Sequence, residues 1–281
     1  MHLTQAILPL AGLGTRFLPW TKVVPKELLP IGNQPIVALL VDEALSVGIR
    51  DICFVISHGK EVIPEYFLSN PTLEALLKKK GKLDALSELT RYHSVNFHVV
   101  YQEEQLGDGH AVLQAADWVK SDTVAILFGD DLIAGTKNGL QQLTSAYDSL
   151  PKADQGAAAM LCLENIARDL TASYGIVNVD DTKSVGRLKR VTGLVEKPAP
   201  SAAPSTLGIV GKYLIPRSTF AVLPTLQHNG NPACPAGREI RIIDALIAQV
   251  RDIPIYGYQV EGIRLDTGRP EGYKEAVRVL G

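Results

Sequence analysis

The chain has 281 residues, of which 46% are hydrophobic and 21% charged, and its formal net charge is −2 at neutral pH. This composition is typical of a globular protein with a full core, and the small net charge argues against a surface for nucleic acid. No apolar run approaches the roughly 18 residues that would span a bilayer, and the first residues lack the basic stretch of a signal peptide. We therefore expect a cytoplasmic protein without nucleic-acid or membrane partners.

The first half of the chain alternates β-branched runs with helical patterns. Strands are predicted at 6–10, 51–57, 97–101 and 123–128, and helices at 36–47, 61–67, 73–80 and 111–119. Because strands that alternate with helices return by right-handed crossovers, the pattern favours a parallel sheet. The predicted fold is α/β, with a Rossmann-like, mixed but mostly parallel central sheet flanked by helices.

The pattern changes at about residue 156, where strand-like segments follow one another with little helix between them. They lie at 157–163, 175–179, 188–196 and 207–214, and are followed by helices at 217–223 and 239–250, a strand at 255–260 and a helix after Pro270. This order predicts a smaller β-rich part that is antiparallel or mixed. Without a repeat or a linker, we expect one domain over residues 1–281, with halves at about 1–135 and 136–281.

The three cysteines carry no recognisable site. Cys53, Cys162 and Cys234 are odd in number, far apart and without Cys-x-x-Cys spacing. This arrangement argues against a disulfide framework and against a cysteine zinc site. We interpret them as buried or incidental thiols in a reducing compartment.

A long loop follows the first strand and contains Gly12, Gly14, Arg16 and Lys26. Glycines after a buried strand let backbone N–H groups approach phosphate oxygens, although a Gly pair alone is also compatible with a simple tight turn. The spacing matches neither a P-loop nor the dinucleotide fingerprint. Two cations on the same loop suit a triphosphate whose leaving group gains charge.

Acidic residues lie where a magnesium site is expected. Asp130 and Asp131 end the fourth predicted strand, and Asp266 lies far downstream in a Leu-Asp-Thr-Gly segment. Mg²⁺ prefers a few carboxylates together with phosphate oxygens and water. Taken alone, the Asp-Asp pair could also be a turn or a helix N-cap.

The string GLGTRFLP at 12–19, followed by PKELLP at 25–30, resembles the signature of the sugar-phosphate nucleotidyltransferases. Within them it is most similar to the bacterial UTP–glucose-1-phosphate uridylyltransferases, and the similarity recurs along nearly the whole chain. The resemblance implies a nucleotide-binding sheet that carries a sugar-binding half, with the active site between them. It also implies that UTP and glucose 1-phosphate give UDP-glucose and pyrophosphate with Mg²⁺ as cofactor.

The resemblance also implies roles for individual residues. Ala11, Gly12, Gly14, Gln102 and Gly107 would bind the nucleotide, with Gln102 and the Gly107 backbone at the base edge. Arg16 and Lys26 would hold the β,γ-phosphates, and Asp130 and Asp266 the metal, with Asp131 in reserve. Gly175 and Glu196 would meet sugar hydroxyls, and Lys197 the sugar phosphate.

Lys197 precedes Pro198, so its backbone is expected to be extended. Successive residues of a strand point to opposite faces. If the strand continues through Glu196 and Lys197, one of them must therefore reach the pocket by a turn or bulge. We expect Lys197 to meet the phosphate and Glu196 the ring hydroxyls.

Several positions depart from the family pattern. Asp108 replaces a usual Leu beside the base-reading segment, which bears on loop shape and base selectivity. Arg241, Ile243, Arg269 and Pro270 replace other usual residues around the expected sugar site or subunit contacts. These departures leave open the same chemistry with dTTP or another sugar 1-phosphate.

The expected reaction needs no general base, because the attacking phosphate is already an anion at neutral pH. The lack of a histidine or cysteine constellation is therefore consistent with an enzyme that works by positioning and charge neutralisation. A relative that only binds nucleotide is the alternative from another class, although its site would be expected to have lost a charged residue. The resemblance further implies a homo-oligomer, a dimer or a tetramer.

Overall fold

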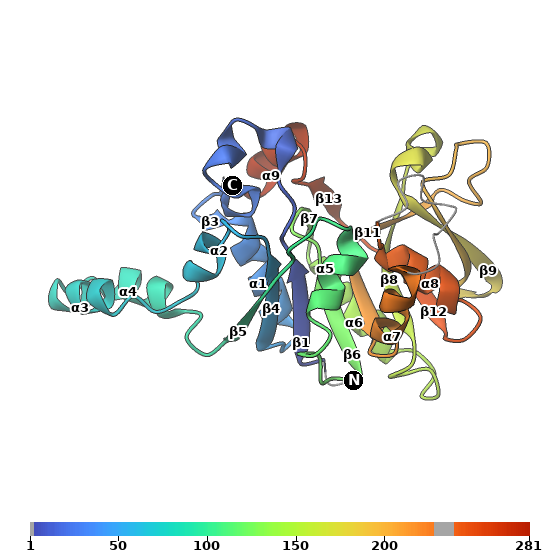
Figure 1. The fold of residues 1–281 in the computed structure, drawn as a ribbon, viewed down its shortest axis with the longest axis horizontal. Helices are drawn as coiled ribbons and strands as arrows, with labels where there is room; N and C mark the ends of the chain where they lie inside the picture. The colour runs from blue at the N-terminus through green and yellow to red at the C-terminus, as the bar shows by residue number, and fades with distance from the viewer. Residues whose placement is uncertain (1–2, 228–238) are drawn as a thin grey trace.

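The structure, a computed structural model, describes residues 3–227 and 239–281, and Cys234 lies outside them. Its central element is a nine-stranded sheet in the order β5-β4-β1-β6-β11-β8-β12-β10-β9 (Figure 1). The strands are β1 (Gln5–Pro9), β4 (Asp51–Ile56), β5 (Asn96–Tyr101), β6 (Thr123–Leu127), β8 (Ala159–Asn165), β9 (Gly175–Val185), β10 (Leu188–Glu196), β11 (Leu207–Pro216) and β12 (Ile255–Gln259). Each corresponds to a predicted strand, although β9 continues beyond its expected end.

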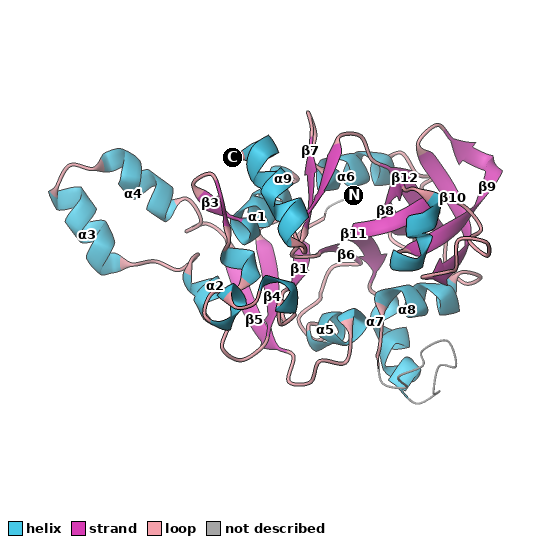
Figure 2. Cartoon of the chain, turned by 90° about the horizontal axis from the view of Figure 1, so that it is seen from above, coloured by secondary structure: helices cyan, strands magenta, loops and turns pink. Residues whose placement is uncertain are grey.

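Helices cover both faces of the parallel part of this sheet. The α-helices are α1 (Ile36–Ser46), α2 (Val62–Glu65), α3 (Pro71–Lys79), α4 (Leu83–Thr90), α5 (Asp108–Gln114), α6 (Gly139–Asp148), α7 (Thr219–Val222), α8 (Ile242–Gln249) and α9 (Pro270–Leu280). On β1, Ala6 and Leu8 join a hydrophobic cluster with α1 and α6, whereas Ile7 joins a second cluster with α5 and α8. This is the period-two alternation of a strand buried on both faces, and Figure 2 shows the two helix pairs on opposite sides.

The remaining five strands close into a small barrel. Along the order β11-β8-β12-β10-β9 each strand pairs with the next, and β9 returns to β11 through the pair Gly208–Ile176. Of these pairs, β8–β12 is parallel and the others are antiparallel. The pair β6–β11, which joins the parallel strands to the barrel, is also antiparallel. The parallel arrangement predicted for the first half is therefore found in β5-β4-β1-β6, and the second half is mixed, as expected; the sheet as a whole is mixed rather than mostly parallel. Neighbours joined by tight turns, such as β9 and β10 at Gly186, can only run antiparallel.

Short elements complete the fold. They are β2 (Pro30–Ile31) with β3 (Gln34–Pro35), β7 (Asp131–Ala134) with β13 (Ile263–Asp266), and the 3₁₀ helices η1 (Thr15–Phe17), η2 (Trp20–Lys22), η3 (Lys26–Leu28), η4 (Arg168–Ser173) and η5 (Leu223–Gln227). Because β13 pairs with β7, Asp266 lies opposite Asp131. The pairing thus brings together acidic segments that are far apart in the sequence.

Two helices are absent from the sequence prediction, and others begin or end differently. α4 and α6 were not predicted; the helix expected at 239–250 starts at Ile242, and that at 217–223 is a short α-helix continued by η5. The start of α6 carries a readable signal, because the Asn138 side chain accepts from the Gln141 N–H while the Gln141 side chain accepts from the Asn138 N–H. This reciprocal capping box marks a helix start.

Helices α3 and α4 project from the body as an arm (Figure 1). Neither contains a buried residue. The expected break at Asn70-Pro71 is the start of α3, since the Asn70 side chain accepts from the Leu73 N–H at 3.1 Å and Pro71 occupies the first turn. Within the part of the chain that the structure describes, no helix has the length and apolar character needed to cross a bilayer.

Candidate active site

The loop between β1 and β2 forms one wall of the candidate site. It carries three short 3₁₀ helices and turns at Gly14, whose φ of 65° lies in the left-handed region that favours glycine. The Thr21 hydroxyl donates to the Gly14 carbonyl at 2.8 Å, and a Cβ on Gly14 would lie 3.1 Å from the Thr21 methyl carbon. Gly14 therefore shapes the loop rather than lining a cavity.

A first cavity opens at the carboxyl ends of β1, β5 and β6. Its lining combines the loop after β1, the segment before α5 and the end of β6: Pro9, Ala11, Gly12, Lys26, Glu27, Gln102, Gln105, Gly107, Asp108, Ala111, Phe128, Gly129, Asp130 and Glu239. Five positions predicted to handle nucleotide or phosphate thus meet in one place, namely Ala11, Gly12, Lys26, Gln102 and Gly107. Arg16 lies at the edge of this region and donates to the Gly268 carbonyl at 3.4 Å.

The segment predicted to read the base is held by its own side chains. Gln102 is buried, and its amide nitrogen donates to the Gly107 carbonyl at 2.9 Å and lies 3.1 Å from Nδ1 of His110. The Gly107 φ of 100° suits glycine, and a Cβ there would lie 2.4 Å from the Ile240 carbonyl oxygen. The segment therefore has a defined shape before any ligand arrives.

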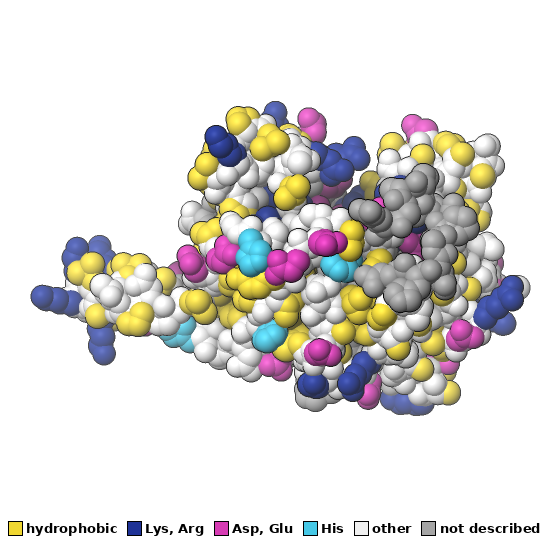
Figure 3. Space-filling view, in the orientation of Figure 1, with side chains coloured by type: hydrophobic (Ala, Val, Ile, Leu, Met, Phe, Trp, Pro, Cys, Tyr) yellow, Lys and Arg dark blue, Asp and Glu magenta, His cyan; other side chains and the backbone are white. Residues whose placement is uncertain are grey.

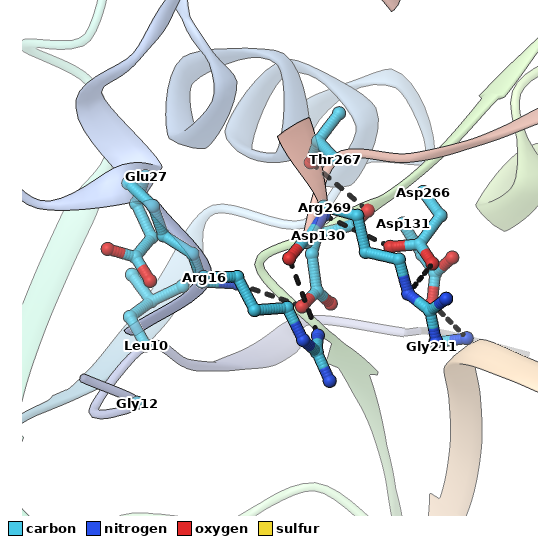
Figure 4. A network of polar contacts seen from close by, with 12 residues as sticks. Leu10, Gly12, Arg16, Glu27, Asp130, Asp131, Gly211, Asp266, Thr267 and Arg269 are labelled. Carbon is cyan, nitrogen blue, oxygen red and sulfur yellow. Dashed lines mark hydrogen bonds and ion pairs between the residues drawn. The ribbon is translucent and has the colours of Figure 1, made fainter. Parts of the chain in front are cut away.

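Two carboxylates converge beside the loop. A Cβ built on Gly268 would lie 2.7 Å from Oδ2 of Asp130 and 3.0 Å from Oδ1 of Asp266, so both side chains border the same point. Nζ of Lys26 donates to Oδ2 of Asp130 at 2.8 Å. Figure 4 shows these acidic side chains beside Arg16. The geometry joins the predicted metal ligands to the predicted phosphate cation.

The charges of this group reinforce one another. Burial alone would raise the pKa of the Asp130 carboxyl, but Lys26 and Arg264 lower it below its ordinary value. Burial would likewise lower the pKa of Lys26, but Asp130 and Glu27 raise it. Asp130 is therefore a carboxylate and Lys26 a cation at neutral pH.

The donor set fits a hard cation that also binds phosphate. Among residues 3–227 and 239–281, no three His, Cys, Asp or Glu side chains are grouped so that they could hold a metal. Mg²⁺ needs fewer protein ligands than that, because it keeps several waters and takes phosphate oxygens from its substrate. Two converging carboxylates suit such a site.

Asp131, the reserve metal ligand, is occupied by protein groups. One carboxylate oxygen accepts from the Gly211 N–H at 2.9 Å and the other from Nε of Arg264 at 2.5 Å. Arg264 also donates to the Tyr174 hydroxyl at 3.0 Å. This arrangement favours Asp130 over Asp131 as the metal ligand and gives Asp131 a structural position.

A second cavity lies next to the first, between the end of β6 and the barrel. Its lining is Asp108, Phe128, Asp130, Asp131, Ser173, Tyr174, Gly175, Glu196, Lys197, Ile209, Gly211, Tyr213, Ile243 and Arg264. All three predicted sugar-side residues, Gly175, Glu196 and Lys197, are in it. Figure 3 shows basic and acidic side chains at the hollow between the barrel and the part of the molecule that contains α9. The two cavities share Asp108, Phe128 and Asp130.

The backbone of Lys197 is not extended as expected. Its φ of 47° lies in the left-handed region, which a non-glycine residue adopts only at a cost. The Lys197 N–H donates to the Tyr174 carbonyl at 3.0 Å, and its Nζ lies 3.3 Å from the Glu196 carboxylate. The turn lets both side chains line one cavity, so the restriction before proline is overcome by the pairing of β9 and β10.

The departures from the family pattern are partly clustered. The Asp108 carboxylate accepts from the Ile242 N–H at 2.8 Å, and burial raises its pKa to about 6. Arg241 is buried, donates to Asp244 at 2.9 Å and lies 3.5 Å from Glu196, while Ile243 lines the second cavity.

Arg269 and Pro270 lie elsewhere. They start α9, with the Arg269 Nε 3.8 Å from the Asp266 carboxylate. These two departures thus border the paired carboxylates and are absent from the lining of the second cavity.

Sequence reasoning missed the side chains that support the site from behind. Lys60 and Arg264 each contact a site segment but carry no motif that would have indicated this, whereas Glu27 lies in the PKELLP string and was given no role there. Cys53 and Cys162 are buried free thiols, as expected. Burial raises the pKa of the Cys53 thiol to about 12, so this cysteine stays a thiol and is not activated as a nucleophile.

Comparisons with known proteins identify the family of this chain. The model of the family described as "Nucleotidyl transferase" matches residues 5–278. UTP–glucose-1-phosphate uridylyltransferase YngB of Bacillus subtilis is 36% identical over 278 residues, which cover 99% of this chain and 89% of that protein.

Solved structures show the same similarity. UTP-bound UGPase from Acinetobacter baumannii has a TM-score of 0.85 and 34% identity, covering 99% of this chain and 93% of that one. A UDP-glucose pyrophosphorylase complexed with UDP-glucose has a TM-score of 0.83 and 30% identity, covering 99% and 98%. The chain therefore belongs to the nucleotidyl transferase family and, within it, to the UTP–glucose-1-phosphate uridylyltransferases.

Proposed function

We propose that this chain transfers the uridylyl group of UTP to glucose 1-phosphate, giving UDP-glucose and pyrophosphate. The observation that carries the proposal is that two adjoining cavities meet at Asp130. One cavity has a glycine-rich loop and a base-reading segment, and the other has an acidic and a basic side chain at the end of a barrel strand. The new bond between two phosphates would form where the cavities join.

The first half of the chain, to about residue 135, is proposed to bind the nucleotide. The backbone of Ala11 and Gly12 would face the nucleotide, and Gln102 and Gly107 the base edge. Arg16 and Lys26 would hold the β,γ-phosphates, since the charge on pyrophosphate grows as it leaves. Gly14 supports this half indirectly, by turning the loop.

The second half, residues 136–281, is proposed to bind the sugar phosphate. Gly175 and Glu196 would meet the ring hydroxyls, and Lys197 would neutralise the phosphate. Glu196 has a cation on either side, Lys197 at 3.3 Å and Arg241 at 3.5 Å. These two contacts fix the direction of the Glu196 carboxylate, as a hydroxyl acceptor requires.

Catalysis by this site rests on alignment of two anions that repel one another. Asp130 and Asp266 would hold Mg²⁺, which when bound neutralises phosphate charge. Lys26 and Lys197 approach the junction from the nucleotide and sugar sides, so each would hold one phosphate in line with the other. Alignment of this kind can lower the activation barrier of the reaction by about 7–11 kcal/mol.

The test is a pyrophosphate-release assay over UTP, dTTP, CTP, ATP and GTP against several sugar 1-phosphates. We expect the highest kcat/KM for UTP with glucose 1-phosphate and no turnover after chelation of divalent metal. Flat background over the whole matrix would overturn the proposal. A clear maximum at dTTP or at another sugar would keep the chemistry and change the substrate.

A cytoplasmic location and a dimeric or tetrameric assembly complete the proposal. The two buried free thiols, Cys53 and Cys162, are consistent with a reducing compartment. Sedimentation of the purified chain would distinguish a monomer from a dimer or a tetramer.

A further inference from the structure

Lys60 lies behind the nucleotide loop and is almost completely buried. It follows β4, and its side chain crosses to the end of β1, where Nζ donates to the carbonyls of Leu10 and Gly12, both at 2.6 Å. Its exposed fraction is 8%. Burial of an ammonium group costs folding free energy unless each of its N–H groups has a hydrogen-bond partner.

Glu27 supplies the remaining partner. Its carboxylate oxygens lie 3.0 and 3.2 Å from the Lys60 ammonium, and the side chain is 1% exposed. Three acceptors thus satisfy the three donors of one ammonium. Glu27 directly follows Lys26, which contacts Asp130. Figure 4 shows Glu27 on the same side of the site as Leu10 and Gly12.

This network fixes the direction of the loop backbone. In a planar trans peptide, a carbonyl and the next N–H point in opposite directions. Because the Leu10 and Gly12 carbonyls point at Lys60, the N–H groups of Ala11 and Leu13 are turned away from it. Ala11 and Gly12 line the first cavity. The same ammonium therefore orients the peptides that face the cavity and anchors the residue next to Lys26.

We propose that Lys60, together with Glu27, is a positioning residue for UTP, which aims the backbone of the nucleotide loop and holds Lys26 in place. The inference rests on the proposed function, since it needs UTP in the first cavity. Lys60 itself does not touch the nucleotide, because its three donors are already used. Its charge is balanced by Glu27, so the pair adds no net charge beside the phosphates.

The test separates loop positioning from a general electrostatic attraction. Lys60→Met removes the donors, and Lys60→Met with Glu27→Gln removes both charges while the net charge of the pair stays zero. If Lys60 acts by position, both variants should lose about tenfold in UTP affinity, the loss expected when several hydrogen bonds to one charge disappear. The KM for glucose 1-phosphate should stay within about twofold, since the second cavity does not depend on Lys60. UTP affinity is measured by titration calorimetry with the full-length protein.

Gln5 provides a matched structural control at the opposite end of β1. It is buried, and its side-chain oxygen accepts from the N–H groups of Lys120 and Ser121 at 2.7 and 2.8 Å. Gln5→Met should lower Tm without changing UTP affinity. The double variant is compared with Gln5→Met at a temperature where both are folded.

Wild-type UTP affinity in the folded Lys60→Met, Glu27→Gln variant would overturn the inference. This variant keeps the net charge of the pair but lacks its hydrogen bonds, so unchanged affinity would mean that Lys60 acts only through its charge. So would an equal loss of UTP affinity in Gln5→Met, since the effect would then follow stability alone. If the unmodified protein fails to bind UTP, the proposed function fails, and the inference falls with it.

Discussion

The nucleotide loop after β1 and the Glu196–Lys197 turn after β10 both place a cation beside an acidic side chain, but their backbones are held differently. The loop is fixed by side chains from other segments, because Lys60 and Thr21 bind its carbonyls. The turn is fixed by strand pairing, with the Lys197 N–H on the Tyr174 carbonyl. Substitution of a residue outside the loop, such as Lys60, should therefore change the conformation of the loop. Substitution of Lys197 should remove its charge and leave the backbone of the turn in place.

The largest effect is expected at the point where the two regions meet. Asp130→Asn or Asp266→Asn should lower kcat by about a hundredfold or more, because a bound metal contributes several kcal/mol of charge stabilisation. Asp131→Asn is the matched comparison; its carboxylate binds Gly211 and Arg264, so we expect mainly a lower Tm. Steady-state kinetics with a magnesium titration checks the prediction. Near-normal turnover in either of the first two variants, or full activity in EDTA, would discard the metal site.

On the barrel side, Lys197→Ala should weaken the use of glucose 1-phosphate by about ten- to a hundredfold, because a charge-assisted contact contributes about 1.5–3 kcal/mol. UTP affinity measured without the sugar should barely change. Lys183→Ala removes an exposed cation from β9 of the same barrel and should leave both values unchanged. Loss of UTP binding with an intact sugar 1-phosphate KM would show that the two halves are wrongly divided.

The turn can also be tested for strain. Lys197→Gly and Lys197→Ala remove the same charge, but only glycine adopts the observed φ of 47° without a steric penalty. The glycine variant should therefore be more stable than the alanine variant by about 1 kcal/mol. Urea unfolding of the two proteins gives the difference. Equal stability would mean that the strand pairing does not enforce this conformation.

On the loop side, Arg16→Ala should lower kcat roughly tenfold and raise the KM for UTP less, because its partner charge grows only in the transition state. The effect is smaller than at Asp130, since Arg16 is exposed and solvent screens its charge. Lys22, an exposed cation on the same loop, serves as the control, and Lys22→Ala should behave as wild type. A raised KM with unchanged kcat would assign Arg16 to ground-state binding.

The smallest effect concerns Asp108, which borders both cavities. Burial raises the pKa of its carboxyl to about 6, with Glu196 and Glu239 adding to the rise and Arg241 opposing it. A carboxyl with a raised folded-state pKa contributes stability below its unfolded pKa of about 4, and this contribution is lost as the pH rises toward 6. Asp108→Asn should therefore flatten the dependence of stability on pH between about 4 and 6. If urea unfolding gives the same pH dependence of stability for Asp108→Asn and for the wild type, other groups cause that dependence.

The sequence predicts the parallel part of the fold better than the barrel, for a physical reason. Continuous runs of apolar, β-branched residues reveal β1, β4 and β6, because both faces of these strands are buried. Closure of the barrel depends on the pairing of Gly208 with Ile176, a long-range contact that no local pattern encodes. α6 could have been found from its capping box at Asn138, whereas α4 carries no side-chain cap that marks its start.

The same limit applies to the site. Short motifs led to Lys26, Asp130 and Lys197, and these residues line the cavities. Lys60 and Arg264 act through contacts with distant backbone or carboxylate groups, so their importance appears only in three dimensions. The left-handed backbone of Lys197 was missed because the local preference before proline points the other way.

Strand β11 belongs to both parts of the molecule, and this affects how the protein unfolds. Residues 212–216 pair with β6 of the open sheet, and residues 207–210 together with Tyr213 and Leu214 pair with β8 of the barrel. Neither part can be released without breaking a ladder that the other part shares. Nucleotide and sugar sites should therefore melt as one cooperative unit, and movements that admit substrate or release product must come from loops rather than from a hinge between the two parts.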